Sequence, residues 1–111
     1  MYDALFNDLP PAKRIPRGRF SGQILVMRDG WRRTLAERLW RGKLFTDDRV
    51  VNFAGPIPVI PGKVSLQDGE LIIDYPQQGL RDRLKPISTV SWLGQIGYRG
   101  ETIWFRLDVS K

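Results

Sequence analysis

Residues Lys63–Tyr75 read KVSLQDGELIIDY, and this stretch indicates the fold class more clearly than any other part of the chain. Two runs that contain β-branched and aromatic residues flank the pair Asp68-Gly69. An Asp-Gly pair between two such runs is typical of a tight type I′ turn. The stretch therefore predicts an antiparallel hairpin, with strands at residues 63–67 and 70–75.

The same alternation of apolar and polar residues recurs at the C-terminal end. In Thr102–Ser110, TIWFRLDVS, every second residue is apolar, which is typical of a strand with one face in a core. The apolar face carries Ile103, Phe105, Leu107 and Val109. Trp104 falls on the opposite, polar face, so it either needs a covering segment or lies exposed.

The other strand candidates are shorter. Apolar or alternating residues predict strands at residues 20–28, 43–46, 49–53 and 90–98. Gly55–Pro61 contains three prolines, each of which lacks a backbone donor, so this segment is predicted to be an edge strand or a crossing loop. Residues 81–88 are charged and include Pro86, and they are predicted to form an edge strand.

One segment has helical periodicity. Trp31, Leu35 and Leu39 recur every four residues, which places them on one face of a helix over residues 31–41. Gly42 follows directly and is predicted to end the helix, because glycine readily adopts the left-handed conformation found just after helices.

These elements together predict a mainly β fold. Seven or eight short strands joined by tight turns form an antiparallel meander, with one short helix after the first strand. Closure into a barrel of about eight strands is expected because it leaves no exposed sheet edges. Residues 20–111 are predicted to form this single barrel domain. Residues 1–19, with three prolines, are predicted to be an extended arm. Leu5, Phe6 and Leu9 are predicted to pin it to the barrel, either in extended form or as one helical turn.

Composition limits the chemistry. The 111 residues include no cysteine and no histidine, so thiolate chemistry, disulfides and histidine-based proton transfer or metal binding are excluded. No cofactor, no metal site and no enzymatic activity are expected.

The sequence shows neither a signal-peptide pattern nor an apolar run long enough for a membrane span, so a cytoplasmic location is expected. The net charge of +6 favours anionic partners or serves solubility alone.

A set of short motifs follows the helical segment. Trp40–Phe45 reads WRGKLF, the pattern W-x-G-K-x-F. Further along the chain come Val51-Asn52, Asp68-Gly69, Asp74-Tyr75, Arg81–Leu84, Leu93-Gly94 and Phe105–Leu107. This order, over about residues 18–109, resembles small lipocalin-like (calycin-type) barrel domains, including the poorly characterised GXWXG-type proteins. Arg38 stands where the name motif of those proteins has its first glycine. The resemblance implies an antiparallel barrel with an internal pocket for a small apolar ligand, and it implies no reaction.

Two groups of residues are candidates for a ligand site. Aromatic side chains are predicted either to line a cavity or to fill the barrel core, because both arrangements follow the same alternation. These aromatic residues are Trp40, Phe45, Phe53, Tyr75, Trp92 and Phe105. Arg81 and Arg106 are predicted either to hold a ligand carboxylate or phosphate at the pocket mouth, or to form ion pairs with Asp74, Asp82 or Asp108.

The sequence therefore predicts a barrel that binds a small hydrophobic or amphipathic ligand, including an anionic one. Two alternatives stay open. Basic residues around the helix, with Trp31 and Trp40, would suit single-stranded nucleic acid; they are Arg32, Arg33, Arg38, Arg41 and Lys43. An exposed Trp104 and open strand edges would instead suit a structural domain that forms a homo-oligomer.

Overall fold

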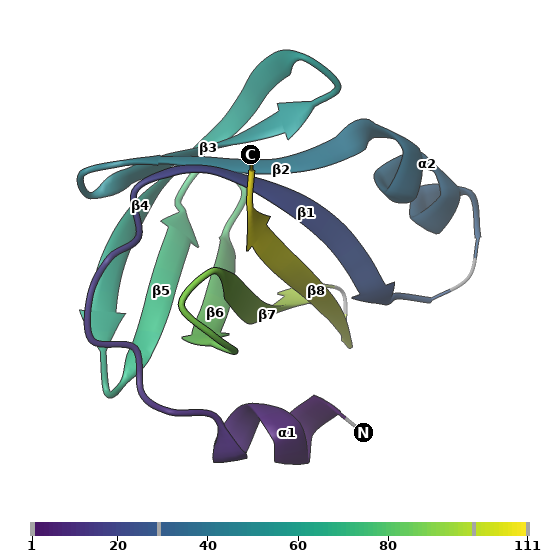
Figure 1. Ribbon diagram of the computed structural model, residues 1–111. Coiled ribbons are helices and arrows are strands. Elements are labelled where there is room, and N and C mark those ends of the chain that lie inside the picture. The colour runs from purple at the N-terminus through teal and green to yellow at the C-terminus, as the bar shows by residue number, and fades with distance from the viewer. Residues whose placement is uncertain (1, 29, 99, 111) are drawn as a thin grey trace.

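Eight antiparallel strands close into a barrel in the computed structural model, which describes residues 2–28, 30–98 and 100–110 (Figure 1). Consecutive strands are hydrogen bonded to each other, and the last strand also pairs with the first. The strands are β1 (Gly18–Val26), β2 (Trp40–Thr46), β3 (Arg49–Ala54), β4 (Ile57–Gln67), β5 (Glu70–Tyr75), β6 (Leu80–Pro86), β7 (Ser91–Tyr98) and β8 (Glu101–Val109). Helix α2 (Trp31–Leu39) follows β1, which confirms the predicted meander with a short helix after the first strand.

The hairpin predicted from residues 63–75 is confirmed. β4 and β5 pair from Lys63–Asp74 to Gln67–Glu70. The two turn residues both have positive φ, 52° at Asp68 and 78° at Gly69, as a type I′ turn requires.

The proline-containing segment is part of a strand with one free edge. β4 begins at Ile57, and its first residues pair with β3 through Ile57, Pro58 and Val59. Pairing with β5 begins only at Lys63, so the prolines lie where β4 has a neighbour on one side. This half of β4 is therefore an edge strand, as predicted. Proline is tolerated there because the backbone N–H that it lacks would have no hydrogen-bond partner.

Two local predictions are wrong. β6 was expected to be an edge strand, but it pairs with both β5 and β7, and Pro86 is tolerated because it is the last residue of the strand. Gly42 was expected to end the helix, yet α2 ends at Leu39 and Gly42 lies inside β2. Its φ of 133° and its close approach to Phe20 explain the glycine, since a Cβ there would lie 1.9 Å from the Phe20 carbonyl oxygen.

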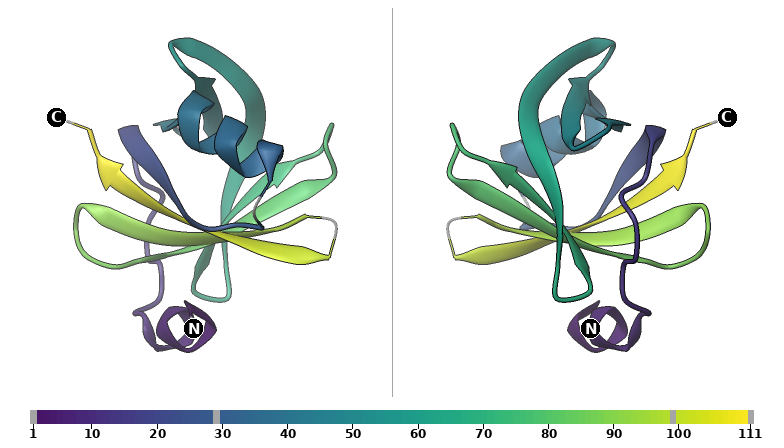
Figure 2. Two further views of the ribbon diagram at one scale, coloured as in Figure 1. Left: turned by 90° about the vertical axis from the view of Figure 1, so that its right-hand side faces the viewer. Right: turned by 90° about the vertical axis from the view of Figure 1, so that its left-hand side faces the viewer.

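The N-terminal arm is helical at its start and then extended. Residues Tyr2–Asp8 form α1, which lies on the side of the barrel opposite α2 (Figure 2). Phe6 packs against Trp104 with 5.7 Å between ring centroids, and Tyr2 lies at the same distance from Trp104. Trp104 is thereby only 5% exposed. Trp104, which the strand pattern places on the outward face, is thus covered by α1 of the same chain.

The interior of the barrel is packed at one end and open at the other. Along β8, Leu107 lies in the packed cluster, Phe105 belongs to both regions, and Ile103 lines a cavity. The same change occurs along β6, where Leu84 lies in the packed cluster and Leu80 lines the cavity. No helix among the described residues is long and apolar enough to cross a membrane.

We expect Phe6→Ala to lower the free energy of unfolding by about 3 kcal/mol or more, because it removes a fully buried ring and uncovers Trp104. Urea unfolding followed by tryptophan fluorescence measures the change. Leu5→Ala is the matched control, since Leu5 lies on the same helix and is 49% exposed. Equal stability of the two variants would show that α1 does not hold the Trp104 side of the barrel.

Candidate functional site

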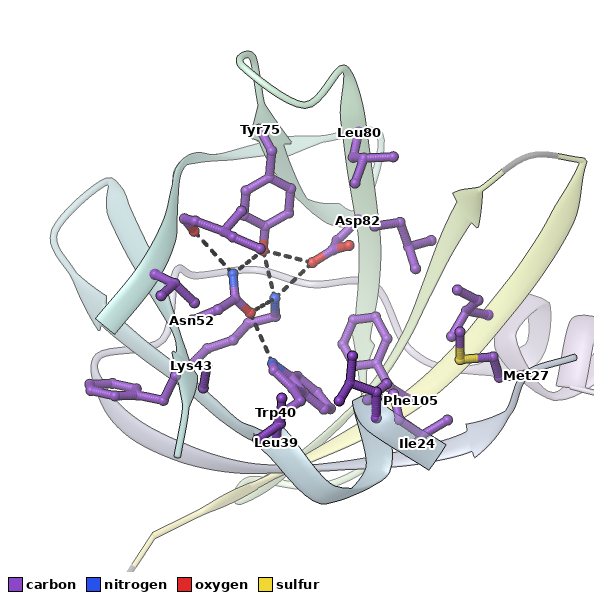
Figure 3. Close-up of a pocket in the computed structure, with 18 of the residues that line it drawn as sticks. Ile24, Met27, Leu39, Trp40, Lys43, Asn52, Tyr75, Leu80, Asp82 and Phe105 are labelled. Atoms are coloured by element: carbon purple, nitrogen blue, oxygen red, sulfur yellow. Dashed lines mark hydrogen bonds and ion pairs between the residues drawn. The ribbon is translucent and has the colours of Figure 1, made fainter. Parts of the chain in front are cut away.

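A cavity of about 560 Å³ opens at the barrel end that α2 covers. Its wall is mainly apolar and comes from α2 and from the strands, with Leu39, Ile24 and Ile96 among the lining side chains. Four polar side chains gather where the cavity meets the packed half of the barrel: Lys43, Asn52, Tyr75 and Asp82 (Figure 3). The site therefore combines an apolar body with a small polar inner end, the composition usual for pockets that hold small molecules.

A bulge in β2 brings two of the site residues to the same face. Trp40 and Lys43 are three positions apart, so a regular strand would point them to opposite faces. The register between β2 and β3 shifts between Trp40 and Gly42, and this irregularity turns both side chains into the barrel. The spacing W-x-G-K in the sequence thus has a structural purpose that the strand pattern alone does not reveal.

Lys43 is the centre of the polar cluster. Its ammonium group donates to Asn52 Oδ1 at 2.7 Å and to the Tyr75 hydroxyl at 2.6 Å. It also forms an ion pair with Asp82 Oδ2 at 3.0 Å, in which the two side chains are 4% and 1% exposed. The Lys43 nitrogen lies 5.1–5.6 Å from the ring centroids of Trp40, Tyr75 and Phe105, so aromatic faces surround the cation as well.

Asn52 connects the cluster to the barrel wall. Its side-chain oxygen accepts a second hydrogen bond from Trp40 Nε1 at 3.0 Å. Its amide group donates to the Ile60 carbonyl at 3.1 Å and to the Tyr75 hydroxyl at 3.2 Å. Ile60 has a φ of 49°, which is unfavourable for a β-branched residue, and it lies at a register shift between β3 and β4. The strained backbone therefore presents the carbonyl that orients Asn52.

Tyr75 and Lys43 both hold their protons firmly. Burial raises the pKa of the Tyr75 hydroxyl, and Asp82 raises it further against the opposing effect of Lys43. Burial alone would lower the pKa of Lys43, but the attraction of Asp82 and Tyr75 outweighs it and the pKa is raised. The Tyr75 hydroxyl donates to Asp82 Oδ2 at 2.9 Å. At neutral pH the cluster consequently contains a lysine cation and a neutral tyrosine, and both of them contact Asp82 Oδ2.

Glycines on adjacent strands make room for the aromatic rings of the site. A Cβ added at any of three glycines would come within 2.9 Å of a ring atom, so only glycine admits the ring. The pairs are Gly22 with Trp40, Gly62 with Tyr75, and Gly94 with Phe105.

The aromatic candidates divide between the cavity and the core. Trp40, Phe53, Tyr75 and Phe105 line the cavity. Phe45 and Trp92 lie in the packed cluster and are not among the lining residues. Both arrangements that the sequence left open are thus realised, each in one half of the barrel.

The two arginine candidates lie away from the cavity. Arg81 pairs with Asp74 at 2.7 Å, and Arg106 pairs with Asp108 at 3.0 Å. Neither arginine lines the cavity, and both ion pairs correspond to the alternative that the sequence had left open.

Lys43, Asn52 and Asp82 belong to the site although they are not among the ligand-binding residues predicted from the sequence. The prediction that Lys43 belongs to a basic surface is wrong, because the residue is 3% exposed. A signal was present: Asp82 alternates in phase with Leu80 and Leu84, so it stands where an inward-facing apolar residue belongs. Of the remaining basic group, Arg32 lines the cavity and Arg33 pairs with Glu37, whereas the Trp31 side chain lies outside the described part of the chain.

Comparison with known proteins identifies the fold and no more. No protein-family model and no curated protein sequence matches the chain. A crystal structure of a protein from Thermomonospora curvata is similar, with a TM-score of 0.70 and 19% sequence identity over 98% of this chain and 85% of that one. At this identity the likeness concerns the barrel architecture alone. Within the described residues, no group of three or more acidic, histidine or cysteine side chains is arranged to hold a metal ion.

We expect Lys43→Met to lower the free energy of unfolding by about 3–5 kcal/mol, because it leaves the Asp82 carboxylate buried without its cation. The double variant Lys43→Met/Asp82→Asn removes both charges and is expected to recover most of that loss. Urea unfolding of the two variants beside the unmodified protein measures the difference. A double variant no more stable than the single one would show that the ion pair is not the source of the cost.

The raised pKa values of Lys43 and Tyr75 predict a loss of stability in alkali. Both groups are protonated in the folded and unfolded protein below pH 10.0, the ordinary value for tyrosine, so their contribution is complete there. As the pH rises past 10.0 and then 10.5, the ordinary value for lysine, the unfolded chain releases its protons first and unfolding becomes easier. Urea midpoints measured stepwise through this range should fall more steeply for the unmodified protein than for Lys43→Met/Asp82→Asn. Parallel curves would contradict the coupling.

Proposed function

We propose that this protein binds one small, largely apolar ligand in the barrel cavity. The observation that carries the proposal is the cavity itself: about 560 Å³ of space with an apolar wall and a buried polar cluster at its inner end. Cavities of a few hundred Å³ with such a lining suit a single small organic molecule. Eight-stranded barrels are wide enough to hold one.

The polar cluster supports a binding role over a purely structural one. A buried ion pair contributes little to stability compared with well-packed apolar residues of the same volume. A barrel that served only as a packed scaffold would be as stable with apolar residues in place of Lys43 and Asp82. Their presence at the end of an open cavity favours recognition of a polar group on a ligand.

The arrangement favours binding without chemistry. The Lys43 ammonium donates to Asn52 and Tyr75 and is paired with Asp82, and its raised pKa keeps it from acting as a neutral nucleophile. The Tyr75 proton is held between the hydroxyl and Asp82. The role is that expected of a lipocalin-like carrier, the family type that the sequence motifs resemble.

Ala36→Trp tests the proposal, because Ala36 lies on α2 and lines the cavity, so the larger ring would occupy part of the space. We expect the unmodified protein to bind the neutral dye Nile red saturably and with one dye per chain, as titration of dye fluorescence would show. Ala36→Trp should weaken this binding at least tenfold. Ala4→Trp makes the same substitution on an exposed position of α1 and should leave the binding unchanged.

Two outcomes would overturn the proposal. Equal dye binding by both tryptophan variants would place the dye on the protein surface rather than in the cavity. An absence of saturable binding to the unmodified protein would mean that the cavity does not accept apolar molecules.

A further inference from the structure

The donors at the inner end of the cavity are all engaged within the protein. Lys43 donates to Asn52 and Tyr75 and forms an ion pair with Asp82. The Asn52 amide uses its two N–H groups on the Ile60 carbonyl and the Tyr75 hydroxyl. Trp40 Nε1 donates to Asn52, and the Tyr75 hydroxyl donates to Asp82 (Figure 3). A ligand that needs a donor therefore finds none available in this cluster.

One strong acceptor is left over. Both contacts to the Asp82 carboxylate, from Lys43 and from Tyr75, end on the same oxygen, Oδ2. No group in the described part of the chain donates to the other oxygen, Oδ1. Every fully buried side-chain polar atom of the described residues has a partner, so an Oδ1 without one must be open to the cavity that Asp82 lines. A 1% exposed carboxylate with one unpartnered oxygen marks a place for a ligand donor.

The charge balance of the cluster decides which donor fits. Lys43 and Asp82 neutralise each other, so a charged head group placed beside them would be buried without a counter-ion. A ligand carboxylate would in addition face the Asp82 carboxylate with no donor between them. A neutral hydroxyl or amide N–H meets neither obstacle.

We propose that the cavity selects ligands with an apolar body and a neutral hydrogen-bond donor at one end, and that this donor binds Asp82 Oδ1. The inference rests on the proposed function and specifies its ligand class. It departs from the anionic ligand that the basic composition had suggested. An anionic amphiphile has one other way to bind, with its tail inward and its head at Arg32 on α2, which also lines the cavity.

Displacement of Nile red by four amphiphiles of one chain length separates these arrangements. The competitors are decanol, decyl methyl ether, decanoate and decylammonium. We expect decanol to displace the dye at a concentration at least tenfold lower than the ether, because only the alcohol supplies a hydrogen bond to a charged acceptor. Decanoate and decylammonium should be weaker than decanol. Displacement by the ether at the same concentration as decanol, or tighter binding of decanoate, would overturn the inference.

Asp82→Asn reverses the polarity of the open atom. Lys43 and Tyr75 would hold the amide oxygen in place of Oδ2, so the amide N–H₂ would face the cavity as a donor. The preference for decanol over the ether should disappear, because both competitors can accept that hydrogen bond. Asp74→Asn is the matched control: Asp74 lies on β5, is paired with Arg81 outside the cavity, and should leave the preference intact.

Asp82→Asn leaves Lys43 without a counter-ion, so Lys43→Met/Asp82→Asn is measured as well and should show the same loss of preference if the single variant does not fold. Failure of the unmodified protein to bind Nile red would reject ligand binding altogether. Dye binding without a preference for the alcohol, or a preference that survives in the folded Asp82 variants, would reject only the assignment to Asp82.

Discussion

The buried ion pair between Lys43 and Asp82 is the constraint around which the barrel interior is arranged. Two charges removed from water are costly unless their remaining hydrogen-bonding groups are satisfied. Asn52 and Tyr75 supply those hydrogen bonds, so four strands, β2, β3, β5 and β6, each contribute one side chain to a single cluster. A shift of one residue in any of these strands would turn its contribution outward and leave a buried charge unpaired. The cluster therefore adds a penalty for a register shift to the one that the buried apolar side chains already impose.

Backbone irregularities next to the cluster follow from the same constraint. The bulge before Gly42 allows Trp40 and Lys43 to share the inner face, and the positive φ of Ile60 presents the carbonyl that Asn52 contacts. Both features are locally unfavourable, yet both serve atoms of the polar cluster. Strain held beside a pocket, and supported by the rest of the sheet, is typical of positions that serve recognition more than stability.

The two helices have different relations to the barrel. Helix α1 completes the outside of the wall, because Phe6 and Tyr2 cover Trp104, which faces away from the interior. Helix α2 lies over the open end, where Leu35 and Leu39 line the cavity while remaining nearly half exposed. One end of the barrel is thus filled by side chains and the other is left open beneath a helix. This division explains how an eight-stranded barrel of this size has both a core and a cavity.

The sequence by itself determined the local elements: the Asp68-Gly69 hairpin, the apolar face of β8, the helix after β1 and the meander order, because turn chemistry and alternation act between near neighbours. It also placed Trp104 on the polar face of its strand, where it either needed a cover or lay exposed. Only the tertiary structure decided that α1 is that cover, that Phe45 and Trp92 fill the core while Trp40 and Tyr75 line the cavity, and that Lys43 is buried beside Asp82. Those outcomes depend on barrel closure, which brings together residues 39 positions apart in the case of Lys43 and Asp82. Alternation can indicate which side of a strand a residue occupies, but depth along the barrel, and the partner found there, depend on how all eight strands are staggered.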